Sequence, residues 1–170
     1  MKANFAKSLA FLLKDEGGND DDPADHGGRT SRGITQREYS AWRANLGLPN
    51  KDVWDASQYE VETIYHDEYW NPYCDQLPSG TDYLYFDMAV NAGPSRAAKL
   101  LQKALGVTPD GRIGPITKKA IAEANVRELI TKFTAEKRAF YISLHQPRFT
   151  KGWLNRCNNV AANALKLIGA

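Results

Sequence analysis

The 170-residue chain has few cysteines, few histidines and no pronounced net charge. Its two cysteines, Cys74 and Cys157, lie far apart, and neither belongs to a CxxC motif. The three histidines are scattered, so no Cys/His cluster has the spacing of a zinc site. We therefore expect no metal and no cofactor. Two free thiols are the favoured interpretation, and a single disulfide is the alternative.

Long apolar stretches are also missing. No run approaches the roughly 20 residues that a membrane-spanning helix needs. The N-terminal residues lack the apolar segment and cleavage site of a signal peptide. The composition, 42% hydrophobic and 25% charged, is ordinary for a globular protein, and the length suits a single domain over residues 1–170. If the protein acts outside the cytoplasm, another factor must release it.

Charge is unevenly distributed. The net charge is only +2, yet residues 126–170 carry a net +6 and the remainder a net −4. A basic segment suits an anionic polymer or surface, such as a cell wall or a lipid layer, although a solvated outer face of helices is the favoured explanation. The near-neutral total and the lack of a recognition motif argue against nucleic acid as a partner.

Strand-like alternation is weak except across residues 28–34, whereas helical periodicity recurs along the chain. The pattern predicts an all-α fold of seven to eight helices, with a small polar loop or β-hairpin after the first helix. A capping box, Thr35 with Glu38, begins the second helix. We expect Thr81 to cap a later helix and Pro147 to end the long one. The predicted helices cover residues 5–16, 35–46, 55–70, 81–91, 94–105, 115–124, 126–144 and 153–168.

Glu16 stands at the end of the first predicted helix, before Gly17-Gly18 and a polar segment rich in Asp, Gly and Thr. A rigid helix would thus bring a carboxyl to the edge of an oxygen-rich loop. The partial negative charge of a helix C-terminus favours the protonated form that a proton donor needs. This arrangement suits general acid catalysis of glycosidic bond cleavage. The alternative is an ordinary solvated glutamate.

Asp25 and Thr30 follow Glu16 by nine and fourteen residues. If the loop folds back, Asp25 could accept a proton from water or stabilise an oxocarbenium-like transition state, and the Thr30 hydroxyl could position that water. Asp20, Asp21 and Asp22 compete with Asp25 for this role. The spacing of these acids does not fit an EF-hand calcium loop.

Aromatic residues cluster between residues 65 and 86, and most are expected in the core. Aromatic faces also stack on the apolar faces of sugar rings. We therefore select Tyr69, Tyr85 and Asn91 as candidate substrate-binding residues. The segment from Asp110 to Thr117 is interpreted as a structural turn.

Eight short motifs occur in order along the chain: Glu16-Gly17-Gly18, Asp22-Pro23-Ala24-Asp25, Gly27-Gly28-x-Thr30-x-x-Gly33-Ile34-Thr35, Tyr69-Trp70, Phe86-Asp87-x-Ala89-Val90-Asn91-x-Gly93-Pro94, Leu101-Gln102-x-Ala104-Leu105-Gly106, Asp110-Gly111-x-x-Gly114-Pro115-x-Thr117 and Gly152-Trp153-Leu154-Asn155-Arg156. With these motifs the chain resembles, from about residue 6 to 158, glycoside hydrolase family 108, the muramidases common among bacteriophage endolysins and their bacterial relatives.

The resemblance implies a lysozyme-like domain that hydrolyses the β-1,4 bond between N-acetylmuramic acid and N-acetylglucosamine in peptidoglycan. It implies that Glu16 is the catalytic glutamate, with a catalytic half at about 6–83 and a peptidoglycan-binding half at about 84–170. Phage-type lysozymes use a Glu, an Asp or Cys, and then a Thr in this order. Because one residue fewer separates Asp25 from Thr30, Ser31 is an alternative to Thr30.

As a phage endolysin, the protein would accumulate in the host cytoplasm and then be released to the periplasm and cell wall. We expect a monomer whose partner is peptidoglycan, and whose basic C-terminal helices also meet an anionic wall or outer-membrane surface. The alternative function is a lysozyme-like module that binds the wall without cleaving it.

Overall fold

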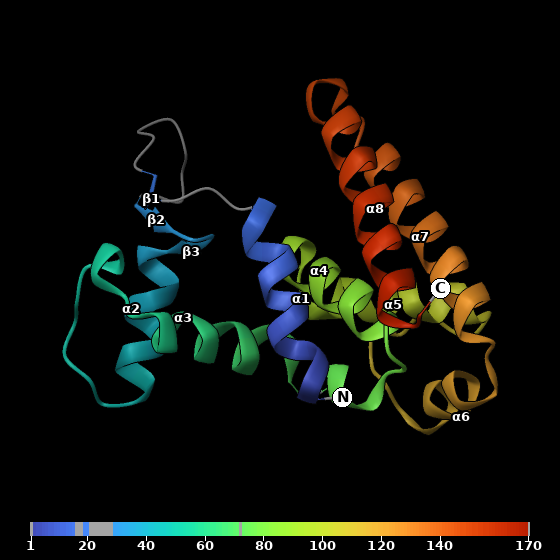
Figure 1. Cartoon of the computed structure of the whole chain (residues 1–170), viewed down its shortest axis with the longest axis horizontal. Helices are drawn as coiled ribbons and strands as arrows, with labels where there is room; N and C mark the ends of the chain where they lie inside the picture. The colour runs from blue at the N-terminus through green and yellow to red at the C-terminus, as the bar shows by residue number, and fades with distance from the viewer. Residues whose placement is uncertain (1, 16–18, 21–28, 72, 170) are drawn as a thin grey trace. The chain divides into compact units, whose positions relative to one another are not determined.

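The computed structural model in Figure 1 describes residues 2–15, 19–20, 29–71 and 73–169. The chain forms two compact units. Unit 1 comprises Met1–Phe5 and Tyr69–Ala170, and unit 2 comprises Ala6–Glu68. The expected division at about residue 83 and the expectation of a single domain both stay predictions.

The predicted all-α architecture is confirmed. Within the described residues there are eight α-helices: α1 (Lys2–Asp15), α2 (Gln36–Asn45), α3 (Gln58–Tyr65), α4 (Thr81–Ala92), α5 (Pro94–Leu105), α6 (Pro115–Glu123), α7 (Val126–Ser143) and α8 (Pro147–Leu167). Short helical segments, η1 (Val53–Asp55), η2 (His66–Trp70) and η3 (Cys74–Gln76), lie between them. None of these described helices combines the length and the apolar character that crossing a bilayer requires.

The small hairpin predicted after the first helix is also present. Strands β1 (Asn19–Asp20), β2 (Thr30–Ser31) and β3 (Ile34–Thr35) form an antiparallel sheet in the order β1-β2-β3. The capping box at the start of α2 is formed as predicted, because the Thr35 hydroxyl accepts from the Glu38 N–H and the Glu38 side chain accepts from the Thr35 N–H.

The predicted cap of α4 was wrong. Gly80, not Thr81, is the N-cap residue, with a φ of +81°. A Cβ on Gly80 would approach the carbonyl oxygen of Ala164 to 2.6 Å and the side chain of Ile130 to 2.9 Å, so the packing of α7 and α8 requires a glycine here. Thr81 is instead the first helical residue, and its hydroxyl is buried.

The predicted start of the last helix was wrong as well. Pro147 does end the preceding segment, but it also occupies the first turn of α8, which begins there rather than at Trp153. Proline suits that position because the first helical N–H groups have no partner within the helix and the fixed φ of proline already matches the helix. As a result, α7 and α8 form a long helical pair joined by a short turn (Figure 1).

Helix α4 is the centre of unit 1. Every residue from Thr81 to Ala89 is buried, and α5, α7 and α8 pack against the helix. A helix that is buried on all sides needs neighbours around its whole circumference, and these three helices supply them. Asp87 is charged within this core: its carboxylate lies 2.6 Å from Nζ of the fully buried Lys137 and 2.8 Å from Nε of Arg156.

The segment from Asp110 to Thr117 is a structural turn held by one buried amide. The Gln102 side chain donates to the Asp110 carboxylate at 2.7 Å and to the Thr117 hydroxyl at 3.0 Å, and it accepts from the Gly111 N–H at 2.8 Å. Gly111 has a φ of +84°, and a Cβ there would lie 2.8 Å from the Ser95 hydroxyl. The turn is therefore fixed against α5.

Candidate active site

Two of the predicted catalytic residues, Glu16 and Asp25, lie outside the described residues. Helix α1 ends at Asp15, which directly precedes Glu16 in the chain. Thr30, the third predicted catalytic residue, lies within the described residues of unit 2. The candidate site is therefore built from the residues around Thr30.

Thr30 belongs to the middle strand of the small sheet. It pairs with Asp20 on one side and with Thr35 on the other. The turn that follows β2 has positive φ at both central residues, 50° at Arg32 and 80° at Gly33, as in the tight turns that suit the twist of a hairpin. Arginine is unusual at such a position, so the hairpin needs support from its surroundings.

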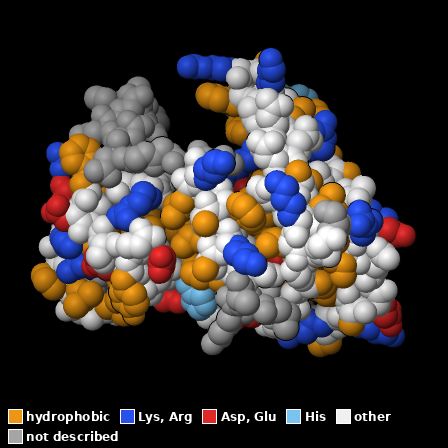
Figure 2. Space-filling model, viewed as in Figure 1, with side chains coloured by type: hydrophobic (Ala, Val, Ile, Leu, Met, Phe, Trp, Pro, Cys, Tyr) orange, Lys and Arg blue, Asp and Glu red, His pale blue; other side chains and the backbone are white. Residues whose placement is uncertain are grey.

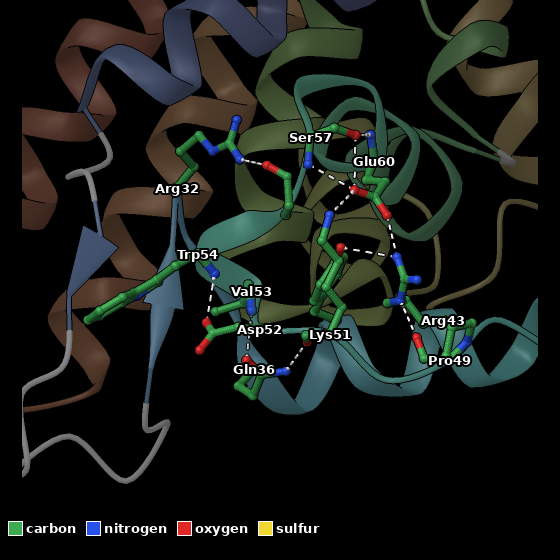
Figure 3. Close-up of polar contacts among 12 residues, drawn as sticks. Arg32, Gln36, Arg43, Pro49, Lys51, Asp52, Val53, Trp54, Ser57 and Glu60 are labelled. Carbon is green, nitrogen blue, oxygen red and sulfur yellow. Dashed lines mark hydrogen bonds and ion pairs between the residues drawn. The ribbon is translucent and has the colours of Figure 1, made fainter.

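Arg32 supplies that support with its own side chain. Its guanidinium donates to the Ala56 carbonyl at 2.5 Å and to the Gln58 side chain at 3.1 Å, while its carbonyl accepts from the Tyr65 hydroxyl at 2.8 Å. These bonds connect the turn to the start and the end of α3 (Figure 3 shows the first of them). The hairpin that carries Thr30 is thus fixed at its turn.

A tryptophan lies next to Thr30. The Trp54 indole N–H donates to the Thr30 carbonyl at 3.0 Å. The guanidinium of Arg29 lies 4.4 Å from the indole ring centroid and also pairs with Asp52. Trp54 is nevertheless 38% exposed. An exposed indole held in a fixed orientation can stack on the apolar face of a sugar ring.

The segment that carries Trp54 is fixed by side-chain hydrogen bonds to its backbone. Gln36 donates to the Lys51 carbonyl at 2.9 Å and accepts from the Val53 N–H at 2.7 Å. Asp52 accepts from the Trp54 N–H at 3.0 Å and so caps η1 (Figure 3). The backbone is therefore held at Lys51, at Val53 and at Trp54 itself, although Trp54 lies outside the long helices.

An ion pair between Arg43 and Glu60 joins α2 to α3. Arg43 lies 2.5 Å from the Glu60 carboxylate and donates to the Pro49 carbonyl at 2.7 Å (Figure 3). Burial raises the pKa of Glu60, but hydrogen bonds from Ser57 and from Tyr39 outweigh it, and the net pKa lies below its ordinary value. Glu60 therefore stays ionised and keeps its pairing with Arg43.

The neighbouring positions Thr30 and Ser31 differ in accessibility. Thr30 is partly exposed, whereas Ser31 is 1% exposed. Consecutive residues of a strand point to opposite faces of the sheet, which explains the difference. A hydroxyl that positions water has to reach the surface, and Thr30 meets this requirement better than Ser31.

The three predicted substrate-binding residues belong to unit 1. Tyr69 is partly exposed in η2, and Asn91 is exposed near the end of α4, where its side chain donates to the Asp87 carbonyl at 2.7 Å. Tyr85 is 1% exposed, its hydroxyl donates to the Pro94 carbonyl at 3.0 Å, and burial raises its pKa well above the ordinary value. Tyr85 thus has the environment of a core residue, and its role in substrate binding stays a prediction.

Sequence reasoning missed Trp54 and its partners Arg29 and Asp52. The available signal was a large aromatic residue between two acids in a segment without helical periodicity. Its nearness to Thr30 could not be inferred, because the two residues are 24 positions apart. Within the described residues, no group of three or more His, Cys, Asp or Glu side chains is arranged to hold a metal. Both cysteines are free and buried.

Comparisons with known proteins agree with the motifs. The family model for glycosyl hydrolase 108 matches residues 9–93, and a model described as a predicted peptidoglycan domain matches residues 96–158. A solved structure, described as that of Brucella abortus SagA, is 35% identical, with a TM-score of 0.85 over 98% of this chain and 97% of that one. No curated protein matches. The chain therefore belongs to the glycosyl hydrolase 108 family, with a glycoside hydrolase domain followed by a peptidoglycan domain.

Proposed function

We propose that this protein is a muramidase, which hydrolyses the β-1,4 bond between N-acetylmuramic acid and N-acetylglucosamine in peptidoglycan. The observation that carries the proposal is the family match over residues 9–93, which includes Glu16, Asp25 and Thr30. The alternative, a wall-binding module without catalysis, would retain the peptidoglycan domain but would not need these three residues.

In this mechanism Glu16 gives its proton to the glycosidic oxygen as the bond to the anomeric carbon breaks. The positive charge that develops on the sugar is stabilised by the Asp25 carboxylate, or Asp25 removes a proton from the attacking water. Thr30 positions that water. The fixed hairpin and the partial exposure of Thr30 support this assignment, because a positioning hydroxyl has to be both ordered and accessible.

Trp54 supports the same substrate class. A hydrogen bond to the Thr30 carbonyl orients its indole, and the residue keeps a third of its surface exposed. A glycan strand offers alternating apolar sugar faces and hydroxyl groups, which match an indole beside polar side chains. We therefore include Trp54 as a substrate-positioning residue.

The deciding experiment measures new reducing ends and new free amines from purified peptidoglycan. We expect wild type to release reducing ends but no amines, and Glu16→Gln to lower the rate at least about 100-fold, because general acid catalysis contributes about 10²–10⁴-fold. Asp25→Asn should also lower the rate, whereas Asp15→Asn, the adjacent carboxylate, should not. Full activity of Glu16→Gln would exclude Glu16. Release of amines, or wall binding without cleavage, would exclude a muramidase.

The proposal extends to host lysis by a bacteriophage endolysin, with the protein held in the cytoplasm until the inner membrane is opened. The basic charge of residues 126–170 suits the anionic wall that the released enzyme would meet. Co-expression with a pore-forming membrane protein tests this role. Lysis should need both the pore and Glu16, and lysis by the Glu16→Gln variant would contradict it.

A further inference from the structure

A groove between α7 and α8 has no role in the chemistry described above. It has a volume of about 680 Å³ and lies at the end of the helical pair, near the turn that joins the two helices. This volume is in the range of sites that bind small molecules or short peptides. All of its lining residues fall between Arg138 and Asn158, within the segment that matches the peptidoglycan domain.

The charge of the groove has one sign. Arg138 and Lys151 line it, and no Asp or Glu does. The chain from Arg138 to Ala170 contains no acidic residue. In Figure 2, Lys and Arg side chains gather beside apolar ones at this end of the α7–α8 pair, without acidic side chains on the visible face. A ligand with negative charge is therefore favoured.

The cations differ in how they are held. Arg138 donates to the Asn158 side chain at 2.8 Å, which joins α7 to α8 and fixes the guanidinium at the groove. Lys151 is exposed, and no ion pair or hydrogen bond engages its ammonium group among the described residues. Lys151 is thus available to bind a carboxylate, and Arg138 is already oriented to do so.

The remaining lining combines amide and apolar side chains. Asn155 and Gln146 can pair with peptide N–H and carbonyl groups, while Ile142 and Leu154 provide apolar contacts. In peptidoglycan the N-acetylated glycan is uncharged, and the free carboxylates belong to the stem peptides, which also carry alanine methyl groups. The groove matches the stem peptide in charge, in amide content and in apolar character.

We propose that the α7–α8 groove binds the carboxylates of a peptidoglycan stem peptide. This inference rests on the proposed muramidase function, because the stem peptide belongs to the same peptidoglycan that the enzyme would cleave. The groove would bind the wall through its peptides, while unit 2 carries the residues assigned to cleavage of the glycan.

The test is calorimetric titration with the glycan-free tetrapeptide L-Ala–γ-D-Glu–diaminopimelate–D-Ala, and with the same peptide after amidation of its carboxylates. Wild type should bind the free acid and not the amide. Lys151→Ala should weaken binding about tenfold, in keeping with the loss of one charge-assisted hydrogen bond. Lys166→Ala is the matched control, because it removes the same charge from an exposed position on the same helix, where Lys166 bonds to Asn163.

Cleavage of peptide-free glycan strands separates this inference from the proposed function. Lys151→Ala should release reducing ends from those strands at the wild-type rate, whereas Glu16→Gln should lose that activity and still bind the peptide. Equal weakening by Lys151→Ala and Lys166→Ala would overturn the inference. Binding of the amidated peptide would overturn it too. So would a Lys151→Ala variant that binds phosphatidylglycerol vesicles less tightly than wild type but binds the peptide with unchanged affinity.

Discussion

The indole N–H of Trp54 donates to the main-chain carbonyl of Thr30 at 3.0 Å, so the two residues are held side by side although η1 and β2 are separate in the sequence. The bond uses the backbone of Thr30 and leaves its hydroxyl free of this contact. It also orients the indole ring, which Arg29 contacts at 4.4 Å from the centroid. The candidate site thus joins a residue predicted to position water with one suited to position sugar.

Replacing Trp54 should raise KM for the glycan more than it lowers kcat. We expect Trp54→Ala to lower kcat/KM for glycan cleavage on the order of tenfold, equivalent to about 1.4 kcal/mol, mainly through a higher KM. Trp54→Phe retains an aromatic face but loses the N–H donor, and it should recover part of the loss. Steady-state release of reducing ends gives both constants.

Tyr59→Ala is the matched control for Trp54. Tyr59 is another aromatic residue of unit 2, 75% exposed on α3, so its loss removes an aromatic side chain without removing the contact to Thr30. Its kinetic constants should equal those of wild type. Equal losses in Trp54→Ala and Tyr59→Ala would show that the effect is not specific to the site.

The buried carboxylate of Asp87 should make stability depend on pH. Burial raises its pKa, but the charges of Lys137 and Arg156 outweigh burial, and the net pKa lies below the ordinary value. A lowered pKa means that the folded state holds the proton less tightly than the unfolded state. The resulting stabilisation is complete above about pH 4, near the unfolded pKa, and is lost as the pH falls through the folded pKa.

Asp87→Asn should lower the free energy of unfolding by about 3–5 kcal/mol near neutral pH, because it leaves Lys137 buried without a counter-charge. Urea unfolding at pH 7, 5, 4 and 3 should show the difference from wild type shrinking below about pH 4. Glu123→Gln, at an exposed residue paired with Lys119, should change stability by less than about 1 kcal/mol. A difference that is constant from pH 5 to pH 3 would contradict the assigned direction.

Gln102 should matter for stability and not for chemistry. Gln102→Leu removes the amide that holds the turn from Asp110 to Thr117, so we expect a loss of about 1–3 kcal/mol in urea unfolding. Lys103→Ala, at an exposed neighbour on α5, should have an effect within about 0.5 kcal/mol. Unchanged stability in Gln102→Leu would mean that the turn is fixed by other contacts.

The sequence alone indicated the helical architecture, because periodicity and capping act within a few residues of each other. The capping box at Thr35 and the turn at Asp110–Thr117 were predicted correctly for this reason. Family motifs indicated the enzyme class in the same way, since they are local patterns that recur in order along the chain. Thr30 was selected by its spacing; the structure shows it partly exposed, and its catalytic role stays a prediction.

Other features depended on contacts between distant segments. Asp87 and Lys137 are 50 positions apart, and the pairing of Trp54 with Thr30 follows from the way η1 meets the sheet. The cap of α4 failed as a prediction because the close approach of Ala164 selects a glycine at position 80. The helix start at Gly80, the position of Trp54 and the buried charge pair depend on which distant surfaces meet, whereas the helices themselves follow from hydrogen bonds and apolar spacing within a few residues.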